Sequence, residues 1–459
     1  MNPLSEPLPD PDPAGAFSRR RPPPATQSRS KILTAIVAAA SDLKRIQWSL
    51  AYAAFILYIF IIVTYKLRIA NVAIVVAAFG LLLRGRKIRF PPVVVLFGAF
   101  VLWAALGAFL SPYPDIVWQT VWDRAKIWII ALVAVNVIIS RAQLRFLLLF
   151  FVACFILVPA RAAVVNYLVG YRLFGRAIGP FIYANPNDLA TLTILAIGVA
   201  CALIVSERKR SWTWLASLAS LGALLILVLM TQSRGAFLGL VVMFGPFVAL
   251  RATRQPKLLI GVGVLAILVI AIAPSGVWKR VAGLSNIGAE NLREVDAEGS
   301  AEQRFEILMT AKRIVSDHPL LGVGLGAYAD ANAQYSPTIG RRDTHNTYAN
   351  LAAETGMPGL VIMLSLLAKV LLDARKARRL ARAATSPVTQ QLRWLELGLI
   401  GFLVTCIFGS YTRLALPYVY LAIVSCMTDM LRREVRAASL VGVAPAPSGP
   451  RGRVRARRG

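Results

Sequence analysis

The chain has 459 residues, of which 57% are hydrophobic, and its mean hydropathy is +0.63. Apolar runs of about twenty residues recur along most of its length, which excludes a set of two or three soluble domains. The formal charge of +29 does not indicate a nucleic-acid-binding protein, because the lysines and arginines stand in short clusters between the apolar runs. The expected fold class is therefore an all-α polytopic membrane protein.

Both ends of the chain carry part of the positive charge. Residues 1–47 contain SRRRPPPATQSRSK, and residues 432–459 end in RGRVRARRG. We expect two basic cytoplasmic tails that contact anionic lipid of the inner leaflet, the first of them with an amphipathic segment. No short apolar stretch with a cleavage site follows the first basic residues, so the first membrane helix is expected to serve as the insertion signal.

The apolar runs predict about twelve membrane-spanning helices. The expected spans are residues 48–65, 69–84, 91–111, 127–140, 146–168, 189–206, 213–230, 235–250, 258–275, 358–373, 394–410 and 414–431. Nine of them fill residues 48–275, and the other three fill residues 358–431. Basic loops, such as RGRKIR at 84–89 and ARKARRLAR at 374–382, follow every second span and share one side with both tails. By the positive-inside rule that side is the cytoplasm.

The opposite face receives the remaining connections. These are residues 112–126, residues 169–188, the corners near Arg234 and Arg413, and the long segment 276–357. Only the long segment is large enough to form a subdomain, and we expect it to be a helical loop that carries the catalytic site. Its chemistry would therefore face away from the cytoplasm, where there is no ATP and no nucleotide sugar.

An amphipathic helix is expected inside this long loop, over SAEQRFEILMTAKRIVSDHP at 300–319. Ser300 and Gln303 make a capping box, and Pro319 ends the helix. Apolar residues at helical spacing predict a stripe that lies on the membrane surface. The members of this stripe are Phe305, Leu308, Ala311 and Val315.

Two patterns that often carry chemistry are interpreted as structural. The glycine run in LLGVGLGAYAD is not flanked by a strand and a helix, which argues against a nucleotide site and favours a turn packed against membrane helices. The four cysteines fall inside apolar runs without a CxxC pair, so neither a metal site nor a disulfide framework is predicted. They are Cys154, Cys201, Cys406 and Cys426.

The stretch GRRDTHNTYANLAAETGMPGL at 340–360 holds the candidate catalytic histidine. The sequence predicts a short helix with Asp343 or Thr344 as N-cap and with Gly356 just beyond its end. His345 would then lie in the first helical turn, where the helix dipole disfavours the protonated imidazole. A neutral imidazole near pH 7 is what a general base requires.

Arg341 and Arg342 directly precede this helix, and their charges favour the same neutral imidazole. The competing interpretation is a structural histidine that caps the loop, and both interpretations remain open on the residues alone. The other histidine, His318, stands before Pro319 at a helix end and is interpreted as structural.

Several arginines fall on the extracytoplasmic side, against the positive-inside bias. Arg234 stands at the junction of two apolar spans, and Arg161 lies inside the fifth span. A charge at bilayer depth costs about 2.5–3.5 kcal/mol even on insertion scales, so these residues are predicted to be functional. The others on this face are Arg172, Arg176, Arg304, Arg341, Arg342 and Arg413. A guanidinium pairs two phosphate oxygens at once, so the cluster favours a lipid-linked phosphate or pyrophosphate, with snorkelling as the alternative for Arg413.

Four motifs in the same order carry a family resemblance. SRGAFLG at 233–239, Arg304, HPLLGVGLGAY at 318–328 and HNTYANLAAETGMPG at 345–359 resemble the O-antigen ligase and O-antigen polymerase superfamily of bacterial inner membranes. The resemblance covers about residues 45–435, and NPND at 185–188 is similar to a further family element. It implies a GT-C type glycosyltransferase of a Gram-negative inner membrane, multi-pass, with its active site facing the periplasm and both termini in the cytoplasm. It implies no cofactor and no metal.

The resemblance also implies substrates and roles. The donor would be a glycan on undecaprenyl pyrophosphate, and the acceptor of a ligase would be a lipid A–core sugar hydroxyl. His345 would take the proton from that hydroxyl, while Arg234 and Arg304 hold the pyrophosphate, with inversion at the anomeric carbon. Further pyrophosphate or substrate contacts are expected from Arg161, Arg176, Arg341, Arg342 and Arg413, and orienting contacts from Asp343, Asn346 and Glu354.

Alternatives to the ligase remain. A polymerase would extend carrier-linked glycan instead; such enzymes often carry two substantial outer loops, whereas the earlier loop here, 169–188, is short, which favours the ligase. Other relatives attach glycans to protein. A secondary transporter would show paired halves and ionisable residues near the midplane, but the long loop has no counterpart in the first half.

Overall fold

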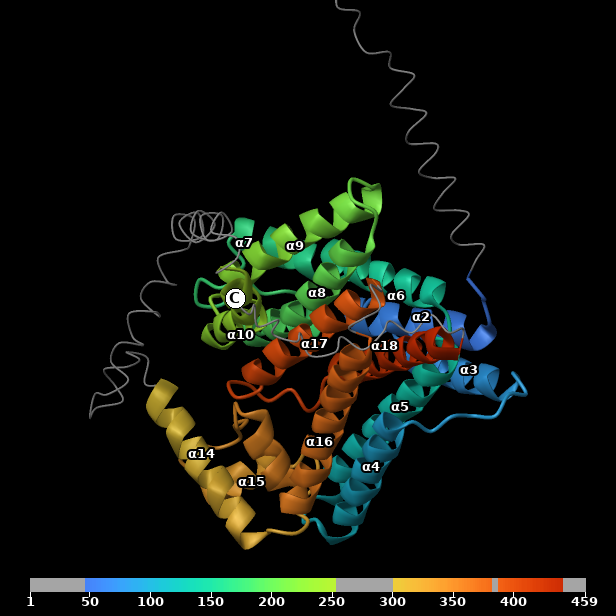
Figure 1. Ribbon diagram of the computed structural model, residues 1–459. Helices are drawn as coiled ribbons and strands as arrows, with labels where there is room; N and C mark the ends of the chain where they lie inside the picture. Colours follow the sequence, from blue (N-terminus) through green and yellow to red (C-terminus); the bar gives the residue numbers. More distant parts are fainter. Residues whose placement is uncertain (1–45, 253–299, 382–386, 441–459) are drawn as a thin grey trace, which may run out of the picture. The chain divides into compact units, whose positions relative to one another are not determined.

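A computed structural model describes residues 46–252, 300–381 and 387–440, which all belong to one compact unit, and in these ranges the chain is helical with no β-strand (Figure 1). The helices are α2 (Leu50–Thr64), α3 (Ala70–Leu82), α4 (Pro92–Leu110), α5 (Pro114–Val137), α6 (Arg141–Phe155), α7 (Arg161–Leu168), α8 (Pro186–Ser206), α9 (Trp212–Thr231), α10 (Arg234–Ala252), α14 (Ser300–Asp317), α15 (Tyr328–Tyr335), α16 (Thr347–Leu380), α17 (Pro387–Thr405) and α18 (Ala415–Leu440). The all-α expectation is confirmed for this part of the chain.

Five helical segments are long and apolar enough to cross a membrane. They are Pro92–Leu110, Arg141–Leu168, Pro186–Ser206, Trp212–Thr231 and Thr347–Leu380, and α2, α3 and the first part of α10 are apolar but shorter. This pattern is that of a polytopic membrane protein. Every expected span within the described residues falls on a helix, whereas 258–275 lies outside them together with most of both tails. The count of twelve spans remains a prediction.

Two helices differ from the expected course of the chain. The segment 112–126 was expected to be a loop, but α5 begins at Pro114, since proline at the first helical position and Asp115 in the first turn favour helix initiation. The expected span 146–168 is interrupted by a π-helical turn, Ile156–Ala160, around Pro159. Proline has no N–H for the regular ladder, so the turn widens there.

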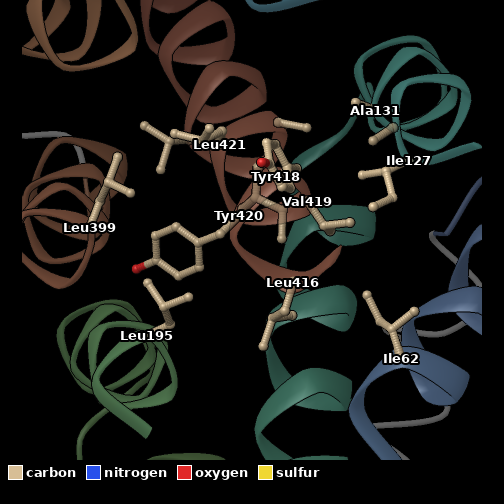
Figure 2. Close-up of a cluster of buried hydrophobic side chains, with 14 of the residues drawn as sticks. Ile62, Ile127, Ala131, Leu195, Leu399, Leu416, Tyr418, Val419, Tyr420 and Leu421 are labelled. Atoms are coloured by element: carbon tan, nitrogen blue, oxygen red, sulfur yellow. The ribbon is translucent and has the colours of Figure 1, made fainter. Parts of the chain in front are cut away.

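The centre of the helical unit is α8, which is buried along most of its length and packs against α17, α9 and α10. Close approach depends on glycine: a Cβ on Gly198 of α8 would lie 3.0 Å from the Cα of Gly398 on α17. Small residues at helix contacts are typical of membrane bundles. Figure 2 shows the hydroxyl of Tyr420 on α18 pointing between Leu195 and Leu399, where it donates to the carbonyl of Leu395 at 3.0 Å.

The helices after the gap, α14 and α15, pack on the first part of α16 (Figure 1). The helix predicted at 300–319 is confirmed as α14, which ends at Asp317 before the proline. Two residues of the expected membrane-surface stripe, Phe305 and Leu308, are 54% and 37% exposed, and its contact with a membrane remains a prediction. A second apolar face, formed by Ile307, Ala311 and Ile314, is buried against the rest of the protein.

The glycine run between α14 and α15 is a tight turn that packs against α16, one of the five candidate spans, and against α5. Gly322, Gly324 and Gly326 all have positive φ. A Cβ on Gly322 would overlap the backbone at 353–355 in α16, and a Cβ on Gly326 would overlap Thr120 of α5. The run therefore joins the loop subdomain to α5 and α16.

Candidate active site

His345 lies outside the helix in which it was expected. Its backbone is left-handed, with φ +51°, and α16 begins two residues later with Asn346 as N-cap. The Asn346 side-chain oxygen accepts hydrogen bonds from the backbone N–H groups of the second and third helical residues, at 3.0 and 3.1 Å. The predicted N-caps, Asp343 and Thr344, are therefore wrong. Gly356, at φ 68° and ψ 178°, interrupts α16 where the short helix was predicted to end.

The left-handed turn at His345 is held by its neighbour. A non-glycine residue in this conformation is uncommon, so surrounding contacts must maintain it. The Thr344 hydroxyl donates to the carbonyl of Asn346 at 2.8 Å and accepts from the backbone N–H of Asn346 at 3.2 Å. It also lies 2.6 Å from the hydroxyl of Ser410, and Thr344 is buried. These contacts fix the direction in which the imidazole leaves the backbone.

The surroundings of His345 favour a neutral ring. Burial lowers the pKa of the His345 imidazole below its ordinary value, and the charges of Arg304 and Arg342 lower it further, while Asp343 acts in the opposite direction. Within the described residues, no hydrogen bond to the ring is formed. The neutral ring therefore has a lone pair that can accept a proton. The pKa of His345 is lowered, as expected, but the main causes are burial and the charge of Arg304 rather than the dipole of a helix that contains the histidine.

The two arginines before the histidine have different surroundings. Arg342 acts on the imidazole, as described. Arg341 instead forms a two-pronged ion pair with Asp330 of α15, with nitrogen–oxygen distances of 2.9 and 3.1 Å. Arg304, in the first turns of α14, is exposed and is the charge with the largest effect on His345. The structure thus brings Arg304, Arg342 and His345 together.

Arg234 is the first residue of α10, directly after the corner that follows α9, as predicted. It is half-buried, and its Nε is fully buried with no hydrogen-bond partner among the described residues. A buried guanidinium N–H without a partner marks a place for an acceptor. The next residue, Gly235, would place a Cβ 3.0 Å from Phe408 in the α17–α18 loop, residues 406–414. The start of α10 therefore packs directly on that loop.

The α17–α18 loop, which packs on the start of α10, also forms hydrogen bonds with the residues on both sides of His345. The backbone N–H of Thr347 donates to the carbonyl of Cys406 at 2.8 Å, and the Thr347 hydroxyl donates to the carbonyl of Gly409 at 2.7 Å. The Thr344 contact with Ser410 adds a third connection. Arg234 and His345, more than a hundred residues apart in sequence, are thus neighbours of one short loop.

Arg176 supports this region from the segment before α8. It is buried, and it donates through Nε to the carbonyl of Thr231 at 2.7 Å and through Nη2 to Asn187 at 2.6 Å. Gln232 adds a hydrogen bond to the carbonyl of Gly175 at 3.2 Å. Arg176 therefore ties the segment before α8 to the corner that presents Arg234.

Two residues near the site were not singled out from the sequence. Asp188, in the first turn of α8, is close enough to Asp343 for the two carboxylates to repel each other. Tyr411 in the α17–α18 loop accepts a hydrogen bond from Thr191 of α8 at 2.9 Å, and the charge of Asp188 acts on its hydroxyl. The NPND motif at 185–188 was a signal for Asp188; nothing comparable marked Tyr411.

The remaining candidates have other surroundings. Glu354 is 2% exposed and accepts a hydrogen bond from the backbone N–H of Tyr328 at 3.4 Å, so it supports the glycine run. Arg413 donates to the carbonyl of Gly326 at 2.7 Å. Arg161 is exposed at the start of α7. All four cysteines are buried and free, and the described residues contain no group of three or more metal-ligating side chains.

Residues 219–364 match a protein-family model whose description is O-antigen ligase. This segment includes Arg234, Arg304 and His345, whereas Arg176, Tyr411 and Arg413 lie outside it. No curated protein matches the sequence.

Proposed function

We propose that this chain belongs to the O-antigen ligase family, whose model its residues 219–364 match, and that it joins a carrier-linked glycan to the lipid A–core. The family is one of glycosyltransferase-like enzymes of lipopolysaccharide biosynthesis with lipid-linked glycans as substrates. The specific donor in the proposal is an undecaprenyl pyrophosphate-linked glycan, and the acceptor is a sugar hydroxyl of the lipid A–core. The family match favours glycan transfer over secondary transport.

One observation supports the proposal most directly. The surroundings of His345, which has a left-handed backbone, favour the neutral imidazole, and the charges of Arg304 and Arg342 act on it. The α17–α18 loop that contacts Thr344 also packs on Gly235, next to Arg234, whose buried Nε has no hydrogen-bond partner among the described residues. A base and several guanidinium groups are what a transfer from pyrophosphate to a hydroxyl requires. The arginines can supply the positive charge that a divalent cation supplies elsewhere.

The chemistry is a single displacement. His345 takes the proton of the acceptor hydroxyl while its oxygen bonds to the anomeric carbon, and the bond from that carbon to the pyrophosphate oxygen breaks. The leaving pyrophosphate keeps the electron pair, and Arg234 and Arg304 stabilise its growing charge. Attack opposite the leaving group inverts the anomeric carbon. Further contacts to the substrates are proposed for Arg161, Arg176, Arg341, Arg342 and Arg413, and orienting contacts for Asp343, Asn346 and Glu354.

The proposal includes a topology. About twelve spans of GT-C type would place both tails in the cytoplasm of a Gram-negative cell and the loop 276–357 in the periplasm. The support is the alternation of basic loops and the gathering of His345, Arg234 and the glycine run at one end of the helices. In whole cells, an Asp343→Cys variant is expected to react with a membrane-impermeant thiol reagent added from the periplasmic side; labelling only after the inner membrane is opened would disprove the topology.

The test of the chemistry uses purified protein in vesicles that contain carrier-linked glycan and lipid A–core. His345→Ala is expected to slow transfer by about a hundredfold or more, which is the usual contribution of a general base. His318→Ala removes the exposed histidine at the end of α14 and should leave the rate unchanged. Transfer at the original rate by His345→Ala would show that the imidazole is not the base. Longer carrier-linked chains without capped core would identify a polymerase instead.

A further inference from the structure

A cavity of about 400 Å³ lies away from His345, where α2, α3, α5 and the end of the α17–α18 loop meet. Isoleucines form part of its wall, and Figure 2 shows two of them, Ile62 on α2 and Ile127 on α5, near the start of α18. Asn71, Gln119 and Thr120 add uncharged polar groups. Its volume falls in the usual range for small-molecule sites, about 300–1,000 Å³.

The charges that line this cavity are mostly positive. Arg124, Lys126 and Arg413 face it, against one carboxylate, that of Asp123. Lys126 and Asp123 pair with each other at 3.0 Å. Arg124 and Arg413 form no ion pair within the part of the chain that the structure describes. The Arg413 guanidinium interacts electrostatically with the buried carboxyl of Glu354 outside the cavity lining, whereas the charge of Arg124 has no ion-pair partner among the described residues.

Arg124 is the most informative of these residues. Its side chain is 2% exposed, although arginine is almost never fully buried without a partner. Nη1 donates to the carbonyl of Arg413 at 3.3 Å, and the guanidinium carbon lies 5.7 Å from the centre of the Tyr418 ring. Nε is buried and has no hydrogen-bond partner among the described residues. The guanidinium is therefore positioned by the protein while one of its donors awaits an acceptor.

We propose that this cavity is a second anion site, which binds the phosphate group of a membrane-lipid headgroup, with Arg124 on its wall and Arg413 at its rim. Guanidinium groups suit phosphate because their planar fork pairs two oxygens. Lipid is the expected source, since α3 lines the cavity through Ala70, Asn71 and Ile74 and presents Val75 and Phe79, 66% and 55% exposed, beside it. A phosphate in the cavity could thus belong to a molecule whose chains lie along α3.

The cavity lining does not include His345, Arg234 or Arg304, but it shares Arg413 with the substrate contacts proposed for the transfer. None of the residues that line the cavity falls within the matched segment 219–364. Arg413 nevertheless connects the two regions, because it donates to the carbonyl of Gly326 in the glycine run. The inference does not rest on the transfer reaction, and its test measures binding alone.

The test titrates the full chain in detergent with phosphatidic acid, and in parallel with phosphatidylcholine of the same acyl chains, and counts bound lipid by native mass spectrometry. Arg124→Gln is expected to weaken phosphatidic acid binding by about tenfold or more, the usual effect of losing a charge-assisted hydrogen bond. Arg68→Gln, the matched control, removes one exposed positive charge from the α2–α3 connection, which does not line the cavity, and should bind as the unchanged protein does.

Inorganic phosphate distinguishes the two sources of the anion. Displacement of phosphatidic acid by millimolar phosphate would show that the phosphate group alone is recognised, and resistance to it would show that the lipid is part of the ligand; both outcomes support the site. If Arg124→Gln does not fold, Arg413→Gln, at the exposed rim, gives the same measurement. Equal phosphatidic acid binding by the unchanged protein and the folded variants, or an equal loss in Arg68→Gln, would overturn the proposal.

Discussion

The two sides of the α17–α18 loop hold their polar groups in different ways. On the histidine side, buried hydroxyls of Thr344 and Thr347 fix the backbone by short hydrogen bonds to the loop, and the imidazole has no hydrogen-bond partner in the described part of the chain. On the cavity side, the guanidinium itself is positioned: Arg124 is held by a carbonyl and an aromatic ring, and its buried Nε has no hydrogen-bond partner among the described residues. On the histidine side the protein orders the backbone that carries the proton acceptor, and on the cavity side it orders the charged group itself.

This difference indicates what each region can do. A base must come close to a hydroxyl and accept its proton, so its own hydrogen-bonding capacity has to remain unused. An anion site only has to present charge, so its guanidinium can use some donors within the protein and keep others for the ligand. Both depend on the glycine run, which contacts α16 through Gly322 and Arg413 through Gly326.

The largest effect is expected from disturbing that shared support. Gly322→Ala places a Cβ against the backbone of Ala353 and Glu354 at a positive φ, and should cost about 3 kcal/mol or more of stability. Gly340→Ala is the matched control, because Gly340 also has positive φ but no atom within 4 Å of the added Cβ. It should cost about 1 kcal/mol. Thermal unfolding followed by tryptophan fluorescence compares them; equal midpoints would contradict the packing described for the run.

A smaller effect should separate the two sides of the loop. Thr344→Val removes the hydroxyl that holds the left-handed turn, so glycan transfer should fall about tenfold while phosphatidic acid binding is retained. Thr344→Ser keeps the hydroxyl and should restore most of the rate.

Thr310→Val provides the control, since the Thr310 hydroxyl is buried and bonds only to the carbonyl of Glu306 within α14. It should reduce stability without selectively reducing transfer. An unaltered transfer rate in Thr344→Val, or the same loss in Thr310→Val, would remove the argument that Thr344 positions the base.

The positions of most helices followed from the sequence because apolar runs of span length leave few alternatives. The glycine run was equally predictable, since no strand–helix unit flanked it. The start of α5 was not predictable, because this stretch is as polar as a loop, with Asp115, Asp123 and Arg124. Packing of α5 against α3, α4 and α18 keeps the stretch helical. Propensity is overridden by tertiary contacts at such a site.

The candidate site was predictable in its residues but only partly in its geometry. Asp343, Thr344 and Asn346 are all good N-caps, and local sequence cannot choose among them. The choice is made by the α17–α18 loop, whose Ser410 contacts Thr344 and leaves Asn346 to cap the helix. Arg124 could not be predicted as a site residue from local sequence either, because the cavity that it lines is formed by elements far apart in the chain.

The smallest expected effect is a shift in the pH at which the transfer rate rises, caused by the charges around His345. This shift has opposite directions for substitutions of Arg342 and of Asp343. The rate should rise with pH as the imidazole loses its proton, and this rise should lie below the ordinary pKa of 6.5, because burial, Arg304 and Arg342 lower the pKa of His345. Arg342→Gln removes a charge that lowers this pKa, so the rise should move to higher pH. Asp343→Asn removes the charge that raises it, so the rise should move to lower pH. Rates normalised to their plateau isolate the position of the rise from any change in substrate binding. Shifts in the same direction for both variants would mean that the titrating group is not the imidazole between them.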